Sequence, residues 1–267
     1  MKDLLARGQR PLLRAFAQAR SAIVLDFDGT LAPIVRDRTA ARMSPRTTAL
    51  LRGIATRYAT AVLSGRAQDD VAARLADADV RYVVGNHGAE WRGTQSSGAR
   101  IAERVGAWHA ALRERLAGVA GVEIENKRYS LAIHYRQASD RAHARWVIRL
   151  ALRNLRGLRI EDGKLVVNVL ADGAPDKGAA LDRLHRVMRC ERLLYVGDDA
   201  NDEPAFLRGD GEKILTVRVG LLRGSAAGFF VRNRRGVDAL LEVLYRLRRG
   251  TAAVCPIERR QIARRAR

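Results

Sequence analysis

The chain has 267 residues, and 47% of them are hydrophobic, which suffices for one large core or for a core with a smaller inserted domain. No apolar stretch approaches the roughly 20 residues that a membrane span needs, and residues 1–16 lack the uninterrupted apolar region of a secretory signal. Cys190 and Cys255 are the only cysteines, and no Cys/His metal spacing surrounds them. We therefore expect free thiols and a cytoplasmic protein that does not enter a membrane.

The formal net charge is +20, and a balance this basic is typical of nucleic-acid-binding proteins. However, the arginines are spread along nearly every expected helix, and aromatic residues make up only 5% of the chain, so no platform for stacking bases is evident. The densest basic cluster lies in the stretch 250–267, which we expect to be a flexible tail. We expect no specific nucleic-acid partner, and a basic protein that binds nucleic acid or an anionic surface remains a remote alternative.

The first third of the chain alternates apolar strands with helices. The continuous apolar run 22–25 is typical of a strand buried on both faces of a parallel sheet, and Ser44-Pro45 is typical of a helix start. The pattern predicts strands over 22–25, 58–63 and 81–84, and helices over 45–57 and from 69 to about 75. This alternation favours a parallel sheet with helices on its faces.

Between residues 90 and 170 the pattern changes to a helix followed by a hairpin, and this unit occurs twice. Helices are expected over 101–116 and 140–155, and Asp162-Gly163 is a strong signal for a hairpin turn. Strands are expected over 122–125, 129–135, 158–160 and 165–170. A repeated α-β-β unit predicts an antiparallel sheet covered by two helices on one face. We therefore predict an inserted α+β cap domain over residues 90–170.

The α/β pattern returns after Pro175. A helix is expected to open at Asp176-Lys177 and another to span 237–247, with strands over 192–196 and 214–219. Together with the first third of the chain, these elements predict a Rossmann-like parallel-sheet core formed by residues 1–89 and 171–249. No coiled-coil or edge-pairing pattern points to self-association, and we expect a monomer.

Polar side chains stand at the ends of the expected strands and at one helix start. They are Asp26 and Asp28 after the first strand, Ser64 after the second, Lys177 at the helix start, and Asp198, Asp199 and Asp202 after the strand 192–196. Because ligands of open α/β sheets bind beyond the carboxyl ends of the strands, we expect these groups to share one crevice. Carboxylates without His or Cys suit Mg²⁺, whereas a lysine, a hydroxyl and backbone N–H groups suit a phosphate. The combination indicates phosphoryl transfer.

Each of these features has a simpler interpretation when it is taken alone. The Asp26–Asp28 segment and Ser64-Gly65 can be turns after strands, and Lys177 can be a solvated lysine. The stretch 197–203 can be an acidic loop or a weak calcium-type site. Their order along one chain nevertheless favours phosphatase chemistry.

Up to about residue 248, the chain resembles the haloacid dehalogenase superfamily of phosphatases. The four motifs of that superfamily match residues 26–30 (DFDGT), Ser64, Lys177 and residues 197–203 (GDDANDE). A C2-type cap with two helices and two hairpins, inserted between the second and third motifs, is one of its known types. The resemblance implies that Asp26 is the nucleophile that forms an aspartyl-phosphate. Asp28 would protonate the leaving alkoxide and later activate water.

The same resemblance implies the remaining roles at the core. Mg²⁺ would be bound by Asp26, the backbone carbonyl of Asp28 and Asp198, with Asp199 and Asp202 completing the metal site. Ser64 and Lys177 would fix the phosphoryl oxygens. Further substrate-binding residues expected in the two phosphate-side motifs are Gly29, Thr30, Gly65 and Arg66.

Within this superfamily, the chain looks like the trehalose-6-phosphate phosphatase family. The segment 85–90 resembles the Gly-x-His-Gly-x-Glu segment of that family, residues 125–136 resemble its cap strand pair, and Gly163-Lys164-x-Val166 followed by Asp176-Lys177-Gly178 resembles the approach to its third motif. The substrate-binding residues that this likeness implies are His87, Gly88, Glu90, Glu125, Lys127, Ser130, His134, Arg136 and Asn168. His134 and Tyr135 can also be packing residues of a strand, and His87 can cap a loop. Many polar groups on a cap suit the hydroxyls of a disaccharide.

Two positions depart from the pattern of that family. Asn168 stands where a glutamate associated with sugar binding is usual, and Asn201 stands where a threonine is usual in the fourth motif. The resemblance implies Mg²⁺-dependent hydrolysis of trehalose 6-phosphate to trehalose and phosphate, in trehalose biosynthesis. The alternative is a phosphatase of the same superfamily acting on another sugar or polyol phosphate. Because water must be excluded and then admitted, we expect the cap to move.

Overall fold

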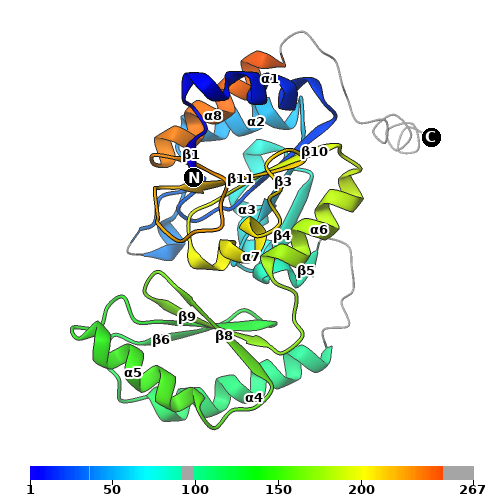
Figure 1. Cartoon of the computed structure of the whole chain (residues 1–267). Coiled ribbons are helices and arrows are strands. Elements are labelled where there is room, and N and C mark those ends of the chain that lie inside the picture. The colour runs from blue at the N-terminus through cyan, green and yellow to red at the C-terminus, as the bar shows by residue number, and fades with distance from the viewer. Residues whose placement is uncertain (36, 92–98, 249–267) are drawn as a thin grey trace.

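The computed structural model describes residues 1–35, 37–91 and 99–248, and the strands in this part of the chain form two separate sheets (Figure 1). The larger sheet consists of β1 (Lys2–Asp3), β2 (Ser21–Leu25), β3 (Ala59–Leu63), β4 (Tyr82–Gly85), β5 (Glu90–Trp91), β10 (Arg192–Gly197), β11 (Ile214–Val219) and β12 (Phe229–Val231). Its order is β1-β12-β11-β10-β2-β3-β4-β5, and all neighbours are parallel except β4 and β5. The predicted Rossmann-like α/β fold is confirmed.

Helices cover both faces of the larger sheet (Figure 1). They are α1 (Arg10–Gln18), α2 (Pro45–Ala55), α3 (Gln68–Arg74), α6 (Lys177–Met188), α7 (Glu203–Phe206) and α8 (Arg234–Leu247). Ile23 and Leu25 of β2 pack in one apolar cluster with α1, α2, α3 and α8, whereas Ala22 and Val24 pack in another with α6 and α7. Successive side chains of a strand point to opposite faces, so β2 is buried on both sides, as its apolar run predicts.

Side-chain caps fix the starts of two helices of the core, α6 and α8. The Asp176 side chain accepts the backbone N–H of Ala179 at 2.8 Å, and Lys177 is therefore the first residue of α6. The Asn233 side chain accepts the N–H of Gly236 at 3.2 Å, and α8 consequently begins earlier than predicted. The cap at Asp176 matters for function because it sets where Lys177 leaves the backbone.

The smaller sheet is formed by the repeated α-β-β pattern that the sequence predicts. Its elements are α4 (Ala99–Leu116), β6 (Glu123–Asn126), β7 (Ser130–His134), α5 (Arg141–Leu152), β8 (Leu158–Gly163) and β9 (Val166–Ala171). The order is β6-β7-β9-β8, and all pairs are antiparallel. Both helices pack on one face of this sheet, and its other face is turned toward the larger sheet (Figure 1). We call the unit from α4 to β9 the cap.

Five helices and strands of the described chain are absent from the sequence prediction. The strands β1, β5 and β12 have 2, 2 and 3 residues, which is too short for an alternating pattern to be visible. The helix α7 has only 4 residues, and α1 carries arginines among the apolar residues that it buries, such as Leu13 and Phe16. Short 3₁₀ turns, η1 (Arg7–Gln9), η2 (Arg38–Ala40), η3 (Ala76–Ala78), η4 (Asn86–Gly88) and η5 (Ala200–Asp202), complete the assignment.

None of the described helices has the length and apolar character that crossing a membrane requires. The expected basic tail over 250–267, and Cys255 within it, lie outside the described residues.

Candidate active site

Three adjacent strands of the larger sheet end in polar residues at the same edge. Asp26 follows β2, Ser64 follows β3 and Asp198 follows β10. The Asp26 N–H donates to the Val196 carbonyl at 2.8 Å and the Ser64 N–H donates to the Val84 carbonyl at 2.9 Å, so the ladder of hydrogen bonds continues through both positions. The parallel arrangement therefore brings these side chains to one crevice, as the sequence predicts.

Lys177 joins two of the carboxylates in this crevice. Its Nζ donates to Asp26 Oδ1 at 2.7 Å and to Asp202 Oδ1 at 2.6 Å, and all three side chains are buried. Burial works to lower the pKa of Lys177, but the carboxylates of Asp202 and Asp26 outweigh it and raise that pKa above its usual value. Lys177 is therefore a fixed positive charge beside Asp26.

Asp202 holds the loop that carries Asp198 and Asp199. Tyr195 Oη donates to Asp202 Oδ1 at 2.6 Å, and the backbone N–H groups of Asp198 and Asp199 donate to Oδ2 at 2.8 and 2.9 Å. Burial works to raise the pKa of Asp202, but Lys177 and these hydrogen bonds keep it below its usual value. With both oxygens engaged by the protein, Asp202 acts on the loop and leaves Asp26 and Asp198 to face the cavity.

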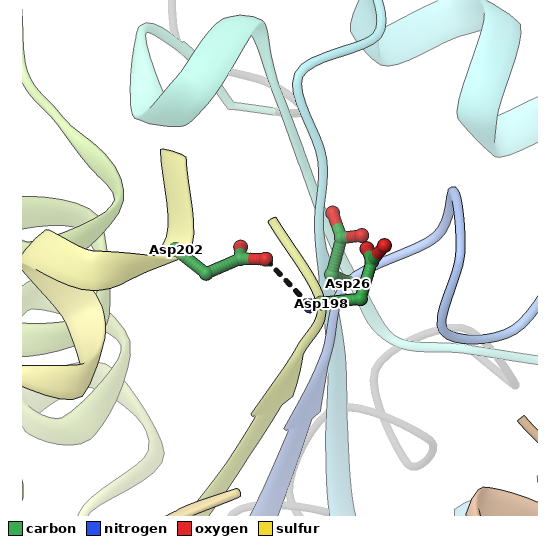
Figure 2. A group of neighbouring side chains, drawn as sticks. All are labelled: Asp26, Asp198 and Asp202. Carbon is green, nitrogen blue, oxygen red and sulfur yellow. Dashed lines mark hydrogen bonds between the residues drawn. The ribbon is translucent and has the colours of Figure 1, made fainter. Parts of the chain in front are cut away.

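The arrangement fits a divalent cation. Carboxylate oxygens of Asp26, Asp198 and Asp202 lie within 4.8 Å of one another, and Figure 2 shows the Asp26 and Asp198 carboxylates close together, with Asp202 approaching from the other side. Burial and the neighbouring carboxylates raise the pKa of Asp26 well above its usual range, and burial with Asp202 raises that of Asp198 to about 6. The buried Asp198 Oδ1 has no hydrogen-bond partner among the described residues. Oxygen ligands of this kind suit a hard ion.

Gly29 is required for this approach of the two strand ends. Its φ of +84° lies in the left-handed region, and a Cβ at this position would lie 2.2 Å from Asp198 Oδ2. Thr30, next to it, has a buried Oγ1 without a hydrogen-bond partner in the described part of the chain. A buried hydroxyl without a partner, in the segment that follows Asp26, is consistent with the expected phosphate contact.

The loop after β3 forms the other wall of the crevice. Ser64 is fully buried, and its Oγ accepts the N–H of Arg66 at 3.1 Å. The His87 N–H donates to the Ser64 carbonyl at 3.0 Å, and a Cβ on Gly65 would lie 2.7 Å from the His87 ring. Segment 85–90 is thereby packed directly on the Ser64 loop. Both ring nitrogens of His87 are buried without partners in the described structure, and burial holds the pKa of His87 well below its usual value.

Arg66 and Asp28 form a two-point ion pair. Arg66 Nε donates to Asp28 Oδ2 at 2.6 Å, and Nη2 donates to Asp28 Oδ1 at 2.7 Å. Arg66 also donates to Asp70 Oδ2 at 2.8 Å. The carboxylate of Asp28 is thus fixed in orientation by a planar fork.

A cavity of about 720 Å³ lies between the core and the cap. The predicted site residues that line it are Asp26, Asp28, Gly65, Arg66, His87, Glu125, Lys127, His134, Arg136, Asn168, Asp198 and Asp199. Ser64, Lys177 and Asp202 lie behind this surface. Glu90 accepts the Gln68 N–H at 2.7 Å and Ser130 donates to Asn86, so these two side chains are engaged within the protein. We call the charged core side of the site, with Asp26, Lys177, Asp198 and Asp202, the floor. The polar cap side, with Glu125, Lys127, His134, Arg136 and Asn168, is the roof.

Cap side chains reach the core at several points. Lys127 Nζ donates to the Gly65 carbonyl at 2.7 Å, and burial and Arg38 lower the pKa of Lys127 to about 8. Glu125 Oε2 lies 3.2 Å from His134 Nε2 and also pairs with Arg38, while burial and Arg38 lower the pKa of His134 to about 4. Arg136 donates to the carbonyl of Val35. The roof of the cavity is therefore tied to the loop that follows β2.

A family model described as Trehalose-phosphatase matches residues 24–226, which is most of the chain. The chain belongs to the trehalose-phosphatase family. This confirms the resemblance, and the prediction of a phosphoric monoester hydrolase is confirmed at the level of the family. One relative, the probable trehalose-phosphate phosphatase 9 of Oryza sativa subsp. japonica, is 30% identical over 281 residues, which cover 90% of this chain and 74% of the relative. A trehalose-phosphate phosphatase of Mycobacterium marinum is 35% identical over 199 residues, covering 70% of this chain and 51% of the relative.

Solved structures agree in fold. The C-terminal domain of a trehalose-6-phosphate phosphatase from C. albicans superposes with a TM-score of 0.78 at 22% identity, covering 89% of this chain and 97% of that domain. A protein described as trehalose-6-phosphate phosphatase related gives a TM-score of 0.71 at 23% identity, covering 85% and 97%. At this identity the likeness establishes the shared fold of core and cap.

The position that departs from the family pattern has a carboxylate beside it. Asn168 of β9 is buried, lines the cavity and stands directly across from Glu161 of β8 in the antiparallel register. Glu161 Oε1 accepts the Arg159 Nε–H at 3.0 Å, and Oε2 lies 3.9 Å from His87 Nδ1. The acidic group that position 168 lacks is thus present on the neighbouring strand. Asn201, the second departure, lines the cavity and has a buried Oδ1 without a partner in the described structure.

Sequence reasoning missed further residues at the site, among them Lys164 and Arg38, which line the cavity, and Glu161, which lies next to the lining residue Asn168. Lys164 Nζ pairs with Asp198 Oδ2, and its N–H donates to Asp199 Oδ2 at 3.2 Å. Arg38 contacts Glu125 of the cap, and Glu161 faces Asn168. Of these residues, the sequence points only to Lys164, which follows the hairpin signal Asp162-Gly163 and lies in the segment Gly163-Lys164-x-Val166 that resembles the family.

Proposed function

We propose that this chain hydrolyses trehalose 6-phosphate to trehalose and inorganic phosphate, with Mg²⁺, through an aspartyl-phosphate on Asp26. The observation that carries the proposal is the clamp of Lys177 on Asp26, beside the carboxylate of Asp198, at the floor of a cavity with a polar roof. Membership of the trehalose-phosphatase family and the names of the relatives support the choice of substrate. A phosphatase for another sugar or polyol phosphate is the alternative, because Asn168 changes the roof.

The chemistry follows from the arrangement at the floor. Lys177 holds Asp26 through Oδ1, which leaves Oδ2 to attack the phosphorus. As the bond from Asp26 to phosphorus forms, the bond from phosphorus to the sugar oxygen breaks, and Asp28 donates a proton to the leaving alkoxide. Water then attacks the phosphorus and gives its proton to Asp28. The bond to Asp26 breaks, phosphate leaves, and both carboxyl groups are restored.

The remaining charge is balanced by groups at the same edge of the sheet. Mg²⁺ bound by Asp26, Asp198 and the Asp28 carbonyl would neutralise charge on the phosphoryl oxygens. Ser64, Thr30 and Lys177 would donate to those oxygens, because hydroxyl and ammonium groups stabilise negative charge. The cap excludes bulk water while the intermediate forms.

The test is release of phosphate from a panel that contains trehalose 6-phosphate, sucrose 6-phosphate, glucose 6-phosphate and glycerol 1-phosphate. We expect trehalose 6-phosphate to have the highest kcat/KM, release to stop in EDTA and return with Mg²⁺, and Asp26→Asn to lose about 10³-fold or more in kcat. Acid quenching followed by mass spectrometry should find the phosphate on Asp26. Unchanged release by Asp26→Asn contradicts the mechanism, whereas a better substrate in the panel contradicts the substrate alone.

A further inference from the structure

Arg66 donates more hydrogen bonds within the protein than an arginine whose guanidinium is free to bind a substrate. A guanidinium has five N–H donors. In this structure Nε and Nη2 donate to Asp28 at 2.6 and 2.7 Å, Nη1 donates to Asp70 at 2.8 Å, and Nη2 also donates to the Arg38 carbonyl at 2.9 Å. Four donors are therefore engaged by the protein, and two of them form the fork on Asp28.

The partners of Arg66 are themselves fixed. Asp70 lies on α3 and accepts from Arg74 Nε at 3.0 Å. Arg74 in turn donates to the carbonyls of Ala41 and Thr39, at 2.6 and 3.1 Å. The fork is thus anchored on one side to α3 and on the other to the loop around η2. An anchored arginine resists the movement that capture of a mobile phosphate would require.

The anchoring loop also connects this network to the cap. The Arg38 carbonyl accepts from Arg66, while the Arg38 side chain pairs with Glu125 and lies 3.6 Å from Glu123 of β6. A chain of contacts therefore runs from Asp28 through Arg66 and Arg38 to the cap sheet. When the cap is seated, the fork on Asp28 is braced from both domains.

We propose that Arg66 is a positioning residue for Asp28: its fork sets the orientation of the carboxylate that handles the proton, and Asp70 and the Arg38 carbonyl hold the fork. The inference rests on the proposed function, in which Asp28 is the acid and base. Each carboxylate oxygen of Asp28 keeps a further lone pair, which can carry the proton that is given to the leaving oxygen and can then accept a proton from water. The phosphoryl group is left to Lys177, Ser64 and Thr30.

The main test separates positioning from phosphate binding. Arg66→Met should lower kcat for trehalose 6-phosphate by about 10- to 100-fold, because misplacing a catalytic group by one ångström has an effect of this size. KM and the inhibition constant of inorganic phosphate should each change by less than about threefold. Arg66→Lys keeps the charge but lacks the planar fork, and should be no better than Arg66→Met. Recovery of kcat by Arg66→Lys, or a tenfold rise of both constants, would overturn the proposal.

A double-mutant cycle asks whether Arg66 acts through Asp28. In single-turnover reactions with excess enzyme, Arg66→Met should lower the rate by less than about threefold in an Asp28→Asn background. If the rate of the double variant falls by the product of the losses of the two single variants, the proposal is overturned. Asp70→Asn should reproduce a smaller kcat loss of about 3- to 10-fold without a change in KM, while Asp69→Asn, the exposed neighbour on the same helix, should not. The activity and substrate ranking of the parent chain, measured first, test the proposed function separately.

Discussion

The edge of the larger sheet and the facing sheet of the cap are built on different principles. At the edge, buried groups satisfy one another: Lys177 binds two carboxylates, and Asp202 accepts four hydrogen bonds. On the cap, Lys127 and His134 are half-buried groups whose pKa values are lowered to about 8 and about 4 by burial and by Arg38. We infer that the residues of the floor are fixed by one reaction, whereas the polar residues of the roof can be replaced by others while the reaction is kept. Substitutions at the floor should abolish chemistry, and substitutions in the roof should retune the substrate.

Lys177→Met should have the largest effect. It removes the ammonium between Asp26 and Asp202, and breaking a buried ion pair by removing one partner destabilises a protein by about 3–5 kcal/mol. We expect phosphate release to fall by about 10³-fold or more, and the urea midpoint of the metal-free protein to fall. Exposed Lys213, changed to Met, is the matched control. Activity of Lys177→Met within threefold of the parent contradicts the role of the floor.

Gly29→Ala should impair the metal site next. The new Cβ would lie 2.2 Å from Asp198 Oδ2, so the carboxylate must move. We expect the Mg²⁺ concentration for half-maximal thermal stabilisation to rise by about tenfold or more. Gly173→Ala is a control for the backbone alone, because Gly173 has a φ of +76° and no atom within 4 Å of the added Cβ. Equal Mg²⁺ requirements in the two variants would show that Asp198 does not hold the ion.

Moving one carboxylate across the roof should alter substrate choice without affecting chemistry. Glu161→Gln should lower kcat/KM for trehalose 6-phosphate by about tenfold, since it removes the carboxylate beside the lining residues Asn168 and His87. The swap Glu161→Gln with Asn168→Glu keeps the net charge and should restore the loss. Release of phosphate from p-nitrophenyl phosphate, which has no sugar, should stay within twofold in all variants. A parallel loss with p-nitrophenyl phosphate would place Glu161 at the floor.

The smallest effect concerns pH and Lys127. Its folded-state pKa is lowered to about 8 from 10.5, chiefly by burial, so between these values the unfolded chain binds more protons than the folded one. The free energy of unfolding contributed by this group therefore rises as pH increases through that window. In urea titrations at pH 7.5 and 9.5, the change in the free energy of unfolding between the two pH values should be about 1 kcal/mol more positive in the parent than in Lys127→Met. An identical pH dependence in both proteins would contradict the burial of a charged lysine here.

The sequence predicts the floor well because its parts obey local rules. Asp26, Ser64 and Asp198 each follow an apolar strand, and parallel strands bring their carboxyl ends to one edge. Asp176 caps α6 and so fixes Lys177. The repeated α-β-β pattern predicts the cap for the same reason, since hairpin signals and helical periodicity are local.

Contacts between core and cap escape such rules. Arg38 lies in a loop without periodicity, and nothing local indicates that it meets Glu125. Glu161 and Asn168 are neighbours only through the register of β8 and β9. The network of Arg66 likewise depends on α3 and on the loop around η2 packing together. These residues are determined by docking of distant segments, for which one sequence carries no signal.

The contact between Lys164 and Asp198 would couple metal binding to the position of the cap, because the cap lysine and a bound cation would pair with the same carboxylate. Lys164 lies in the turn between β8 and β9, and its Nζ pairs with Asp198 Oδ2, while Asp198 Oδ1 has no hydrogen-bond partner among the described residues. A cation held by Asp198 would bring a second positive charge to the carboxylate with which Lys164 pairs, and like charges repel. This coupling is reciprocal, so each would weaken the other by the same factor. The contact of Lys164 with Asp198 would therefore lower the affinity for a cation, and a bound cation would weaken the hold of Lys164 on the floor.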